Sequence, residues 1–580
     1  MPQTRKERIL KVNNILLSAF SKRKRLKKEL EKENDKLISF ANENLKKEYK
    51  AIKEGSVISV IPPEKPDLQT ALNYIKQTKY ARAYGMFLQL LKSSPNDIML
   101  IKGCASSLLC LKAYNIVLDY FVPKLLPYKD DLEALDIVAN AYFSTQEYYE
   151  KSIPIFENLL KLQPNLKKDY NFKLACMYKR VYQDKKLDTQ IKYAKAALEE
   201  LININMVYVL LAKMYYRKGD KNKAKEYLDK MMNNNPAAEH IVAYGRFYMK
   251  EGEITKGYDI YRQRFNTGLV AYPKALLPEK RWDGKTDLSD STVILHYEQG
   301  FGDSIMFCRY IPELSKLAKK LIFVVQKNII PILKSSGFDE YCEILSHEAD
   351  VNPNISLDNT NSSVMYSAGS GMGKIDHDFH IPLMDTPFLM KESPKKMYQS
   401  GGYLKTDRKK EQAFKSKYIN KNKKIKIGIA YHGTKESILT NRDISVKKFL
   451  PLFELKGVEF YSFQADKYAE ELKQLDKNIK IKDLGKHFKD FEDTACAINS
   501  MDLIVSTDNV VMNLAGALGV KTYGLFNVFS ESRWYKTEGE DVGWYKSVRP
   551  FRAKTFNDWD NLMTDVKQAI IEDFKLSELN

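Results

Sequence analysis

The sequence predicts an α plus α/β chain, in which a solenoid of helical hairpins precedes two α/β halves. Three observations lead to this fold class: a repeat at helix-pair period over residues 67–266, short apolar strands that alternate with helical stretches after residue 280, and a length of 580 residues. That length corresponds to three or four domains of roughly 100 to 200 residues each. Hydrophobic residues make up 44% of the chain and charged residues 29%, a composition typical of folded protein.

The helical repeat is clearest at three prolines, Pro95, Pro164 and Pro236, which lie 69 and 72 residues apart. Each interval is about twice the ~34-residue period of a two-helix repeat. At fixed distances before each proline the chain has an aromatic, a small and a large apolar residue. Small residues let paired helices approach closely, and the proline ends the second helix. We expect about five repeats, similar to the tetratricopeptide family, whose solenoids present a concave peptide-binding face; a helical bundle with accidental periodicity is the alternative.

The net charge of +19 is concentrated in two segments. Residues 1–55 contain 16 Lys/Arg and 8 Asp/Glu, and residues 405–426 contain 10 and 2. We interpret residues 1–60 as a basic helical extension, either solvated or a docking helix for a partner or an anionic surface, and residues 401–424 as a basic linker. A protein that binds nucleic acid spreads its basic residues over a folded groove interleaved with aromatics, so nucleic acid is not an expected partner.

Neither a membrane span nor a signal peptide is expected, because no window approaches 18 uncharged apolar residues. The six cysteines include no Cys-x-x-Cys pair. This spacing argues against a zinc site or a disulfide framework and favours a cytoplasmic protein.

Two α/β halves follow the repeats. The first begins with a strand at Thr292–Tyr297, a helix at Asp303–Leu317 and a strand at Leu321–Gln326, which together form a βαβ unit. The pattern restarts after the basic linker, with strands at Ile425–Tyr431, Val458–Phe463, Leu503–Ser506 and Thr522–Phe526. We therefore place an N-terminal half at 280–400 and a C-terminal half at 425–575, with a cleft between them.

The turn after the first strand contains Gly300, Gly302 and Asp303 and leads directly into a helix. Sites in α/β proteins lie at the carboxyl ends of strands. The glycines allow a ligand to approach the backbone. Asp303 is either a helix N-cap, which would contribute about 1 kcal/mol, or a general base that takes the proton of an attacking hydroxyl.

The corresponding turn of the C-terminal half contains Asp508 and Asn509 and opens a helix from Val510 to Leu518. Free backbone amides at a helix N-terminus bind anions such as a pyrophosphate. Capping alone would also explain Asp508.

A family resemblance rests on these turns together with further motifs. They are Arg281-Trp-Asp-Gly284, Glu298-Gln-Gly-Phe-Gly-Asp303, Gly428-Ile-Ala-Tyr-His-Gly433, Val505-Ser-Thr-Asp508, Leu514-Ala-Gly-Ala-Leu-Gly519 and Arg533-Trp534. Over about 280–570, with repeats before it, the sequence resembles the bacterial tetratricopeptide-repeat glycosyltransferases, relatives of the heptosyltransferase-like GT-B enzymes with two Rossmann-like halves. The resemblance implies an inverting, metal-independent transfer of a sugar from a nucleotide-sugar to a hydroxyl. It also implies a protein acceptor, possibly of the flagellin-like class, presented by the repeats; no cofactor is expected.

The resemblance also implies the site residues. Asp303 would be the catalytic base, on the acceptor side, and no residue would bind a metal. The donor-binding residues, mostly in the C-terminal half, would be Gly300, Gly302, His432, Gly433, Arg442, Gln464, Asp508, Asn509, Val510 and Asn513.

The chain departs from the family pattern at two helix positions. Where the family usually reads Asp-Thr-Ala-x-x-His-Leu-Ala, this chain has Asn509 for the threonine and Asn513 for the histidine. Tyr431 also stands where tryptophan is common. Asparagine donates and accepts hydrogen bonds, so a binding role stays open. Two alternatives remain: a binding scaffold without catalytic activity, and a transferase that acts on a glycan or lipid-linked saccharide.

Other motifs carry little weight. Asp376-x-Asp378 and Asp558-x-Asp560 have the spacing of a metal motif of other glycosyltransferases, but 37 aspartates in 580 residues predict about 2.4 such pairs by chance. Residues 369–374 resemble a phosphate-binding loop, yet its first glycine and its Ser/Thr are absent.

Overall fold

The computed structural model describes residues 66–145, 148–162, 169–199, 204–266, 276–298, 300–346, 375–392, 402–433, 442–527, 532–534, 543–554 and 557–576. The chain divides into two compact units, Met1–Ala224 and Lys225–Asn580. The basic extension expected at 1–60 and the loop at 369–374 lie outside the described residues.

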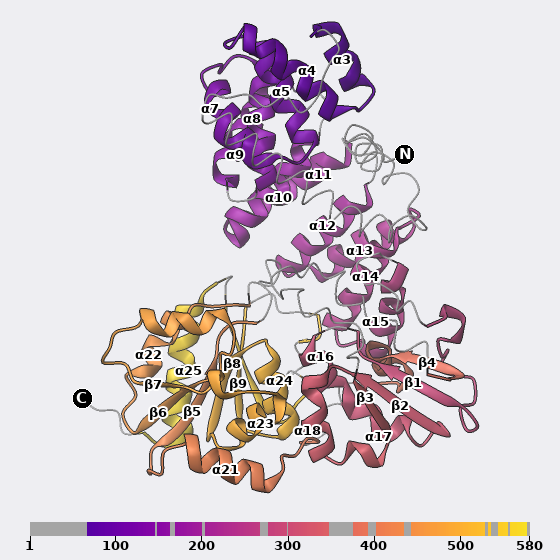
Figure 1. Cartoon of the computed structure of the whole chain (residues 1–580), viewed down its shortest axis with the longest axis vertical. Helices are drawn as coiled ribbons and strands as arrows, with labels where there is room; N and C mark the ends of the chain where they lie inside the picture. The colour runs from indigo at the N-terminus through magenta and orange to yellow at the C-terminus, as the bar shows by residue number, and fades with distance from the viewer. Residues whose placement is uncertain are drawn as a thin grey trace, which may run out of the picture. The chain divides into compact units, whose positions relative to one another are not determined.

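The first unit is built of helices that pack as successive hairpins (Figure 1). They are α3 (Leu68–Lys76), α4 (Tyr80–Ser93), α5 (Ile98–Cys110), α6 (Tyr114–Ile116), α7 (Val122–Leu125), α8 (Leu132–Thr145), α9 (Tyr149–Leu162), α10 (Tyr170–Val181), α11 (Leu187–Ala196) and α12 (Asn205–Arg217), with α13 (Lys221–Met232) crossing the unit boundary. The small repeat positions Ala83 and Ser152 are completely buried, and Ser152 Oγ donates a hydrogen bond to Ala139 O at 2.8 Å across a hairpin. The predicted helical repeat is confirmed.

The last helical hairpin, α14 (Ala238–Lys250) and α15 (Ile254–Tyr261), shares its core with the N-terminal α/β half. A Cβ atom on Gly257 would lie 2.9 Å from Gly245 O, so glycine lets the two helices touch. On the other side, the Tyr258 ring lies edge-on to Phe307, with centroids 6.0 Å apart. This packing explains why the unit boundary falls inside the region expected to form one solenoid, 67–266.

The N-terminal half contains a four-stranded parallel sheet of order β3-β2-β1-β4. The strands are β1 (Thr292–His296), β2 (Lys320–Val325), β3 (Glu343–Ser346) and β4 (Phe379–Pro382); the helices are α16 (Phe301–Phe307), α17 (Ile311–Leu314), α18 (Ile330–Ser335) and α19 (Thr386–Leu389). The single helix expected at Asp303–Leu317 is two short helices joined by a 3₁₀ turn. Pro312 lies in the first turn of α17, and a proline there cannot donate the hydrogen bond that would continue α16.

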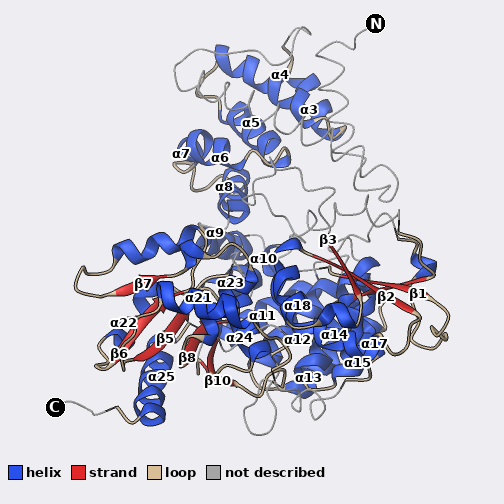
Figure 2. Cartoon of the chain, turned by 60° about the horizontal axis from the view of Figure 1, so that its bottom comes forward, coloured by secondary structure: helices blue, strands red, loops and turns tan. Residues whose placement is uncertain are grey.

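The C-terminal half contains a six-stranded parallel sheet of order β10-β9-β8-β5-β6-β7 (Figure 2). Its strands are β5 (Ile425–Ala430), β6 (Val458–Ser462), β7 (Ile481–Asp483), β8 (Leu503–Thr507), β9 (Thr522–Phe526) and β10 (Val548–Arg552), and its helices include α22 (Leu450–Phe453), α23 (Phe491–Asn499), α24 (Val510–Leu518) and α25 (Trp559–Phe574). The predicted fold class, helical repeats followed by two α/β halves, is confirmed.

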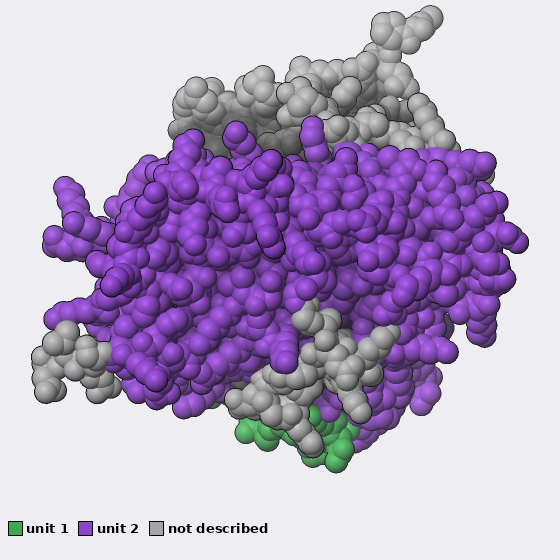
Figure 3. Space-filling view, turned by 90° about the horizontal axis from the view of Figure 1, so that it is seen from below, with its two compact units in different colours: residues 1–224 green, residues 225–580 purple. Residues whose placement is uncertain are grey.

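The segment expected to be a basic linker, 401–424, contains a fixed helix, α21 (Arg408–Tyr418). Asp407 caps it by accepting from Lys410 N at 2.8 Å, and the buried Phe414 stacks near Phe488, with ring centroids 6.2 Å apart. Tyr418 stacks on His487, with centroids 4.3 Å apart, so two aromatic residues tie this charged helix to the C-terminal half. In Figure 3 the described residues of the second unit form one continuous body.

Among the helices that the structure describes, none has a stretch that is both long and apolar enough to cross a bilayer.

Candidate active site

The first strand-end turn fixes Asp303 at the start of α16. Gly300 is the N-cap of this helix, and Asp303 is its third residue. Asp303 Oδ2 accepts a hydrogen bond from Gly300 N at 3.1 Å, and the residue is only 8% exposed. Asp303 is therefore not the N-cap that the sequence suggested as its structural role. It supports the cap from within the helix, with one carboxylate oxygen.

The other carboxylate oxygen of Asp303 pairs with Arg533, which follows β9 in the C-terminal half. The Arg533 carbonyl accepts a hydrogen bond from Trp544 Nε1 at 2.9 Å. Trp544 is completely buried and lies edge-on to Phe307 of α16, with centroids 5.4 Å apart. Sequence reasoning did not include Arg533 in the site; its place in the Arg533-Trp534 motif was the available signal.

The second strand-end turn joins β8 to α24. Asn509 is the N-cap, and its side-chain oxygen accepts hydrogen bonds from the amides of Val511 at 2.9 Å and Met512 at 3.4 Å. Among the residues that the structure describes, none accepts a hydrogen bond from the amide of Asn509 or Val510. The helix ends at Gly519, which adopts a left-handed conformation with φ 78°. Two amides at the helix start thus remain for an anion.

The two turns face each other across the boundary between the halves. A Cβ atom on Gly302 would lie 3.1 Å from Asn513 Nδ2 and 3.8 Å from Val510 Cα, so glycine permits this approach. Asn513 Nδ2 donates to Asn509 O at 2.9 Å, and Asn513 Oδ1 accepts from Tyr545 Oη at 3.0 Å. Asn513 therefore makes its hydrogen bonds inside the protein, at the place where the halves meet.

Arg442 lies beside the second turn. Its Nη1 is 3.8 Å from Asp508 Oδ2, and its side chain is 25% exposed. A Cβ atom on Gly433 would lie 3.1 Å from Arg442 Nη2, and Gly433 N donates to Asp443 Oδ1 at 2.7 Å. The structure thus brings Gly433, Arg442 and Asp508 together.

His432 and Gln464 hold the ends of β5 and β6 together. Gln464 Oε1 accepts from His432 N at 3.1 Å, and its amide donates to Asp466 Oδ1 at 2.7 Å. The His432 ring stacks on Tyr468, with centroids 3.9 Å apart, and its Nε2 lies 2.7 Å from Glu471 Oε1. Both side chains are engaged within the C-terminal half, unlike the pair formed by Asp303 and Arg533.

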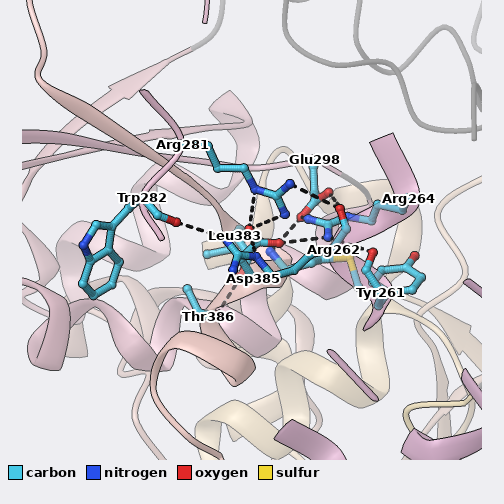
Figure 4. Close-up of polar contacts among 10 residues, drawn as sticks. Tyr261, Arg262, Arg264, Arg281, Trp282, Glu298, Leu383, Asp385 and Thr386 are labelled. Atoms are coloured by element: carbon cyan, nitrogen blue, oxygen red, sulfur yellow. Dashed lines mark hydrogen bonds and ion pairs between the residues drawn. The ribbon is translucent and has the colours of Figure 1, made fainter. Parts of the chain in front are cut away.

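A buried ionic cluster lies behind the first turn, at Glu298 (Figure 4). Arg264, 1% exposed, donates to both oxygens of Glu298, at 2.7 and 2.6 Å, and to Asp385 Oδ1 at 2.9 Å. Asp385 also pairs with Arg262 at 3.3 Å and Arg281 at 2.5 Å. Burial opposes ionisation of Asp385, but the three arginines outweigh it and hold its pKa below the ordinary value. No motif in the sequence indicated that Arg264 would belong to this cluster.

One aspartate of each Asp-x-Asp motif makes a structural contact. Asp378 Oδ2 accepts from Thr292 N at 2.8 Å, and Asp560 pairs with Lys448 at 2.7 Å. In the described part of the chain, no three His, Cys, Asp or Glu side chains gather as a metal site would need.

No model of a known protein family matches the chain. Over 335 residues, 56% of its length, the chain is 23% identical to Protein FlbA of Caulobacter vibrioides. It spans 54% of the length of that relative.

Several solved structures are similar to parts of the chain. A glycosyl transferase family 9 protein from Veillonella parvula is 12% identical, with 51% of this chain and 92% of that chain covered and a TM-score of 0.33. The Escherichia coli ADP-heptose lps heptosyltransferase II is 11% identical, with 49% and 99% covered and a TM-score of 0.33. MamA from Desulfovibrio magneticus is 17% identical, with 28% and 90% covered and a TM-score of 0.26.

Proposed function

We propose that the protein is a glycosyltransferase, which moves a sugar from a nucleotide-sugar to a hydroxyl of a protein acceptor. The approach of the two strand-end turns carries this proposal. Gly302, next to Asp303, lies against the start of α24, where the amides of Asn509 and Val510 have no acceptor among the described residues. A carboxylate that can take a proton and a helix end that can bind a phosphate therefore adjoin.

The reaction follows from these two groups. The acceptor hydroxyl gives its proton to Asp303 while its oxygen attacks the anomeric carbon of the sugar. The bond from that carbon to the nucleotide phosphate breaks on the opposite face, so the configuration inverts. The leaving phosphate gains negative charge, which Arg442 and the amides of Asn509 and Val510 stabilise.

In this proposal the helical repeats bind the protein acceptor. The hairpin α14–α15 shares a hydrophobic core with the N-terminal half, which carries Asp303. A polypeptide held by this hairpin would lie next to the half that supplies the base. A surface protein of the flagellin-like class is the acceptor that the sequence resemblance favours.

A binding scaffold without catalysis is the second candidate, and the position of Asn513 favours it. This residue replaces the histidine of the family pattern, and both ends of its amide are hydrogen-bonded within the protein. A scaffold of this kind would bind the acceptor and leave the donor site without a ligand.

Calorimetry with a panel of nucleotides separates the two candidates. We expect a nucleoside mono- or diphosphate to bind without added magnesium, and Arg442→Ala to weaken binding by about 1.5–3 kcal/mol, the range for a hydrogen bond to a charged group. Arg549→Ala is the matched control, because it removes an exposed arginine from β10 of the same half. If no nucleotide binds, the transferase proposal fails. Binding that requires a divalent ion would refute the metal-free mechanism and reopen Asp376 and Asp378 as ligands.

The acceptor class has its own test. Proteins from a strain lacking the gene are incubated with the purified enzyme and the donor, and intact masses are compared with and without donor. A sugar-sized mass increase on a surface protein supports a protein acceptor. A donor-dependent mass increase found only in glycan or lipid fractions would contradict it.

A further inference from the structure

In the free protein both carboxylate oxygens of Asp303 are covered by neighbouring groups, and the buried Oδ1 accepts no hydrogen bond from the described residues. Oδ2 accepts from Gly300 N, and Oδ1 pairs with the Arg533 guanidinium. A general base must present an oxygen to the proton that it takes. The helix cap uses Oδ2, and Arg533 covers Oδ1. Arg533 must therefore move before Asp303 can act as a base.

Arg533 lies close to the expected phosphate site. It contacts Asp303, whose neighbour Gly302 would place a Cβ atom 3.8 Å from Val510 Cα at the start of α24. A planar guanidinium binds phosphate oxygens in pairs and is preferred at such sites. A diphosphate bound at α24 would carry more negative charge than the single carboxylate that now holds Arg533.

The carbonyl groups of Arg533 and Trp534 are both held by hydrogen bonds, so the exchange needs only the Arg533 side chain to turn. The Arg533 carbonyl is held by Trp544, and the next residue, Trp534, is 3% exposed. The Trp534 carbonyl accepts from Arg552 Nη2 at 3.1 Å. The Arg533 side chain itself is 19% exposed, which leaves it an open side.

We propose that Arg533 is a ligand of the donor phosphate that changes partner when the donor binds. In the free protein it holds Asp303; in the donor complex it turns to the phosphate and releases Asp303 Oδ1. The released oxygen then accepts the proton of the acceptor hydroxyl, the new bond to the anomeric carbon forms, and the electron pair of the broken bond stays on the phosphate beside Arg533. This inference rests on the proposed function and adds the order in which the site becomes active.

Such an exchange ties base release to donor binding. Because Arg533 leaves Asp303 only for a phosphate, the base is available only while a donor is present.

The first test measures binding of a nucleoside and of its diphosphate to variants of Asp303 and Arg533. Asp303→Asn keeps an oxygen for Gly300 N but releases Arg533, so we expect the diphosphate to bind roughly 3- to 30-fold more tightly, with nucleoside affinity unchanged. In that background Arg533→Gln leaves no unpaired carboxylate, and it should weaken diphosphate binding roughly 10- to 100-fold. Asp560→Asn removes the same charge from an exposed pair and serves as the control.

A crystal structure of the wild-type protein with nucleoside diphosphate is the second test. We expect the guanidinium of Arg533 within hydrogen-bond distance of a phosphate oxygen and away from Asp303 Oδ1. If the diphosphate binds while Arg533 stays on Asp303, or if Arg533→Gln lowers nucleoside and diphosphate affinity equally, the exchange is refuted and the transferase proposal stands. If neither ligand binds any variant, the proposed function fails and this inference fails with it.

Discussion

The two strand-end turns present polar groups at the carboxyl ends of parallel strands, and they are stabilised in different ways. The turn after β1 is anchored from behind by Glu298, whose two oxygens bind Arg264 from the segment that follows the last helical hairpin. The turn after β8 is stabilised locally, because the amide side chain of Asn509 caps its own helix. One turn depends on buried charges supplied by distant segments, and the other on a neutral side chain within it.

This difference shows which turn the helical repeats can influence. A buried charge is costly unless every partner is present, so the geometry around Glu298 holds only while the last hairpin is docked. The Asn509 cap needs no such partner. We therefore expect the acceptor-side turn to respond to changes in the hairpin and the donor-side turn to be insensitive to them.

The largest expected effect comes from breaking the ionic anchor. Arg264→Met removes the partner of Glu298 and one partner of Asp385, which leaves buried carboxylate charge uncompensated. Loss of one member of a buried pair costs about 3–5 kcal/mol. Urea unfolding of the full chain measures the change in unfolding free energy.

The matched control is Asp560→Asn, which breaks an exposed ion pair with Lys448. Exposed pairs contribute about 0–1 kcal/mol. A similar small loss for Arg264→Met would show that the cluster does not anchor the first turn.

The second prediction concerns how the stability of the first sheet depends on pH. Burial lowers the pKa of His380, on β4, to about 4, from an ordinary value of 6.5, with Arg281 and His377 acting in the same direction and Asp385 against them. The unfolded chain then binds a proton that the folded protein does not, so stability falls as the pH drops from about 6.5 to about 4. The loss should reach about 2–3 kcal/mol.

The described strands of the second sheet contain no histidine, whereas β1 of the first sheet also holds the completely buried His296, whose pKa is lowered by burial and by His380. His380→Phe should make the dependence of unfolding free energy on pH less steep over this interval, and His296 should account for part of the slope that remains. An unchanged slope in this variant would exclude His380 as its source.

The smallest effect tests the neutral cap. Asn509→Ala removes the acceptor of the Val511 and Met512 amides and should cost about 1 kcal/mol, whereas Asn509→Ser keeps a capping oxygen and most of the stability. Thermal unfolding compares the two variants. Equal losses would mean that capping is not what Asn509 contributes.

The sequence predicted the strands well because buried parallel strands are short apolar runs. Thr522–Phe526 was predicted with the bounds that β9 has. The single helix predicted from Asp303 to Leu317 was wrong. The apolar pattern alone does not show that Pro312 cannot donate the backbone hydrogen bond that would continue the helix.

The site was predictable where its residues follow strands in the chain. Their position directly after a predicted strand was enough to place Asp303, Asn509 and Val510 at the two turns. Arg264 and Arg533 could not, because each reaches its partner from a segment far away in the sequence. The Arg533-Trp534 motif marked Arg533 but did not indicate its partner. Their roles depend on tertiary contacts with Glu298 and Asp303.

The central claim is that the facing turns form a transferase site with Asp303 as its base. Its most direct test is the rate of sugar transfer to the surface protein identified as acceptor, measured for wild type and Asp303→Asn at saturating donor. Asparagine keeps an oxygen for Gly300 N, so folding and donor binding should be retained while turnover falls roughly 10²–10⁴-fold. Turnover near the wild-type rate in a variant that still folds and binds donor would contradict the claim.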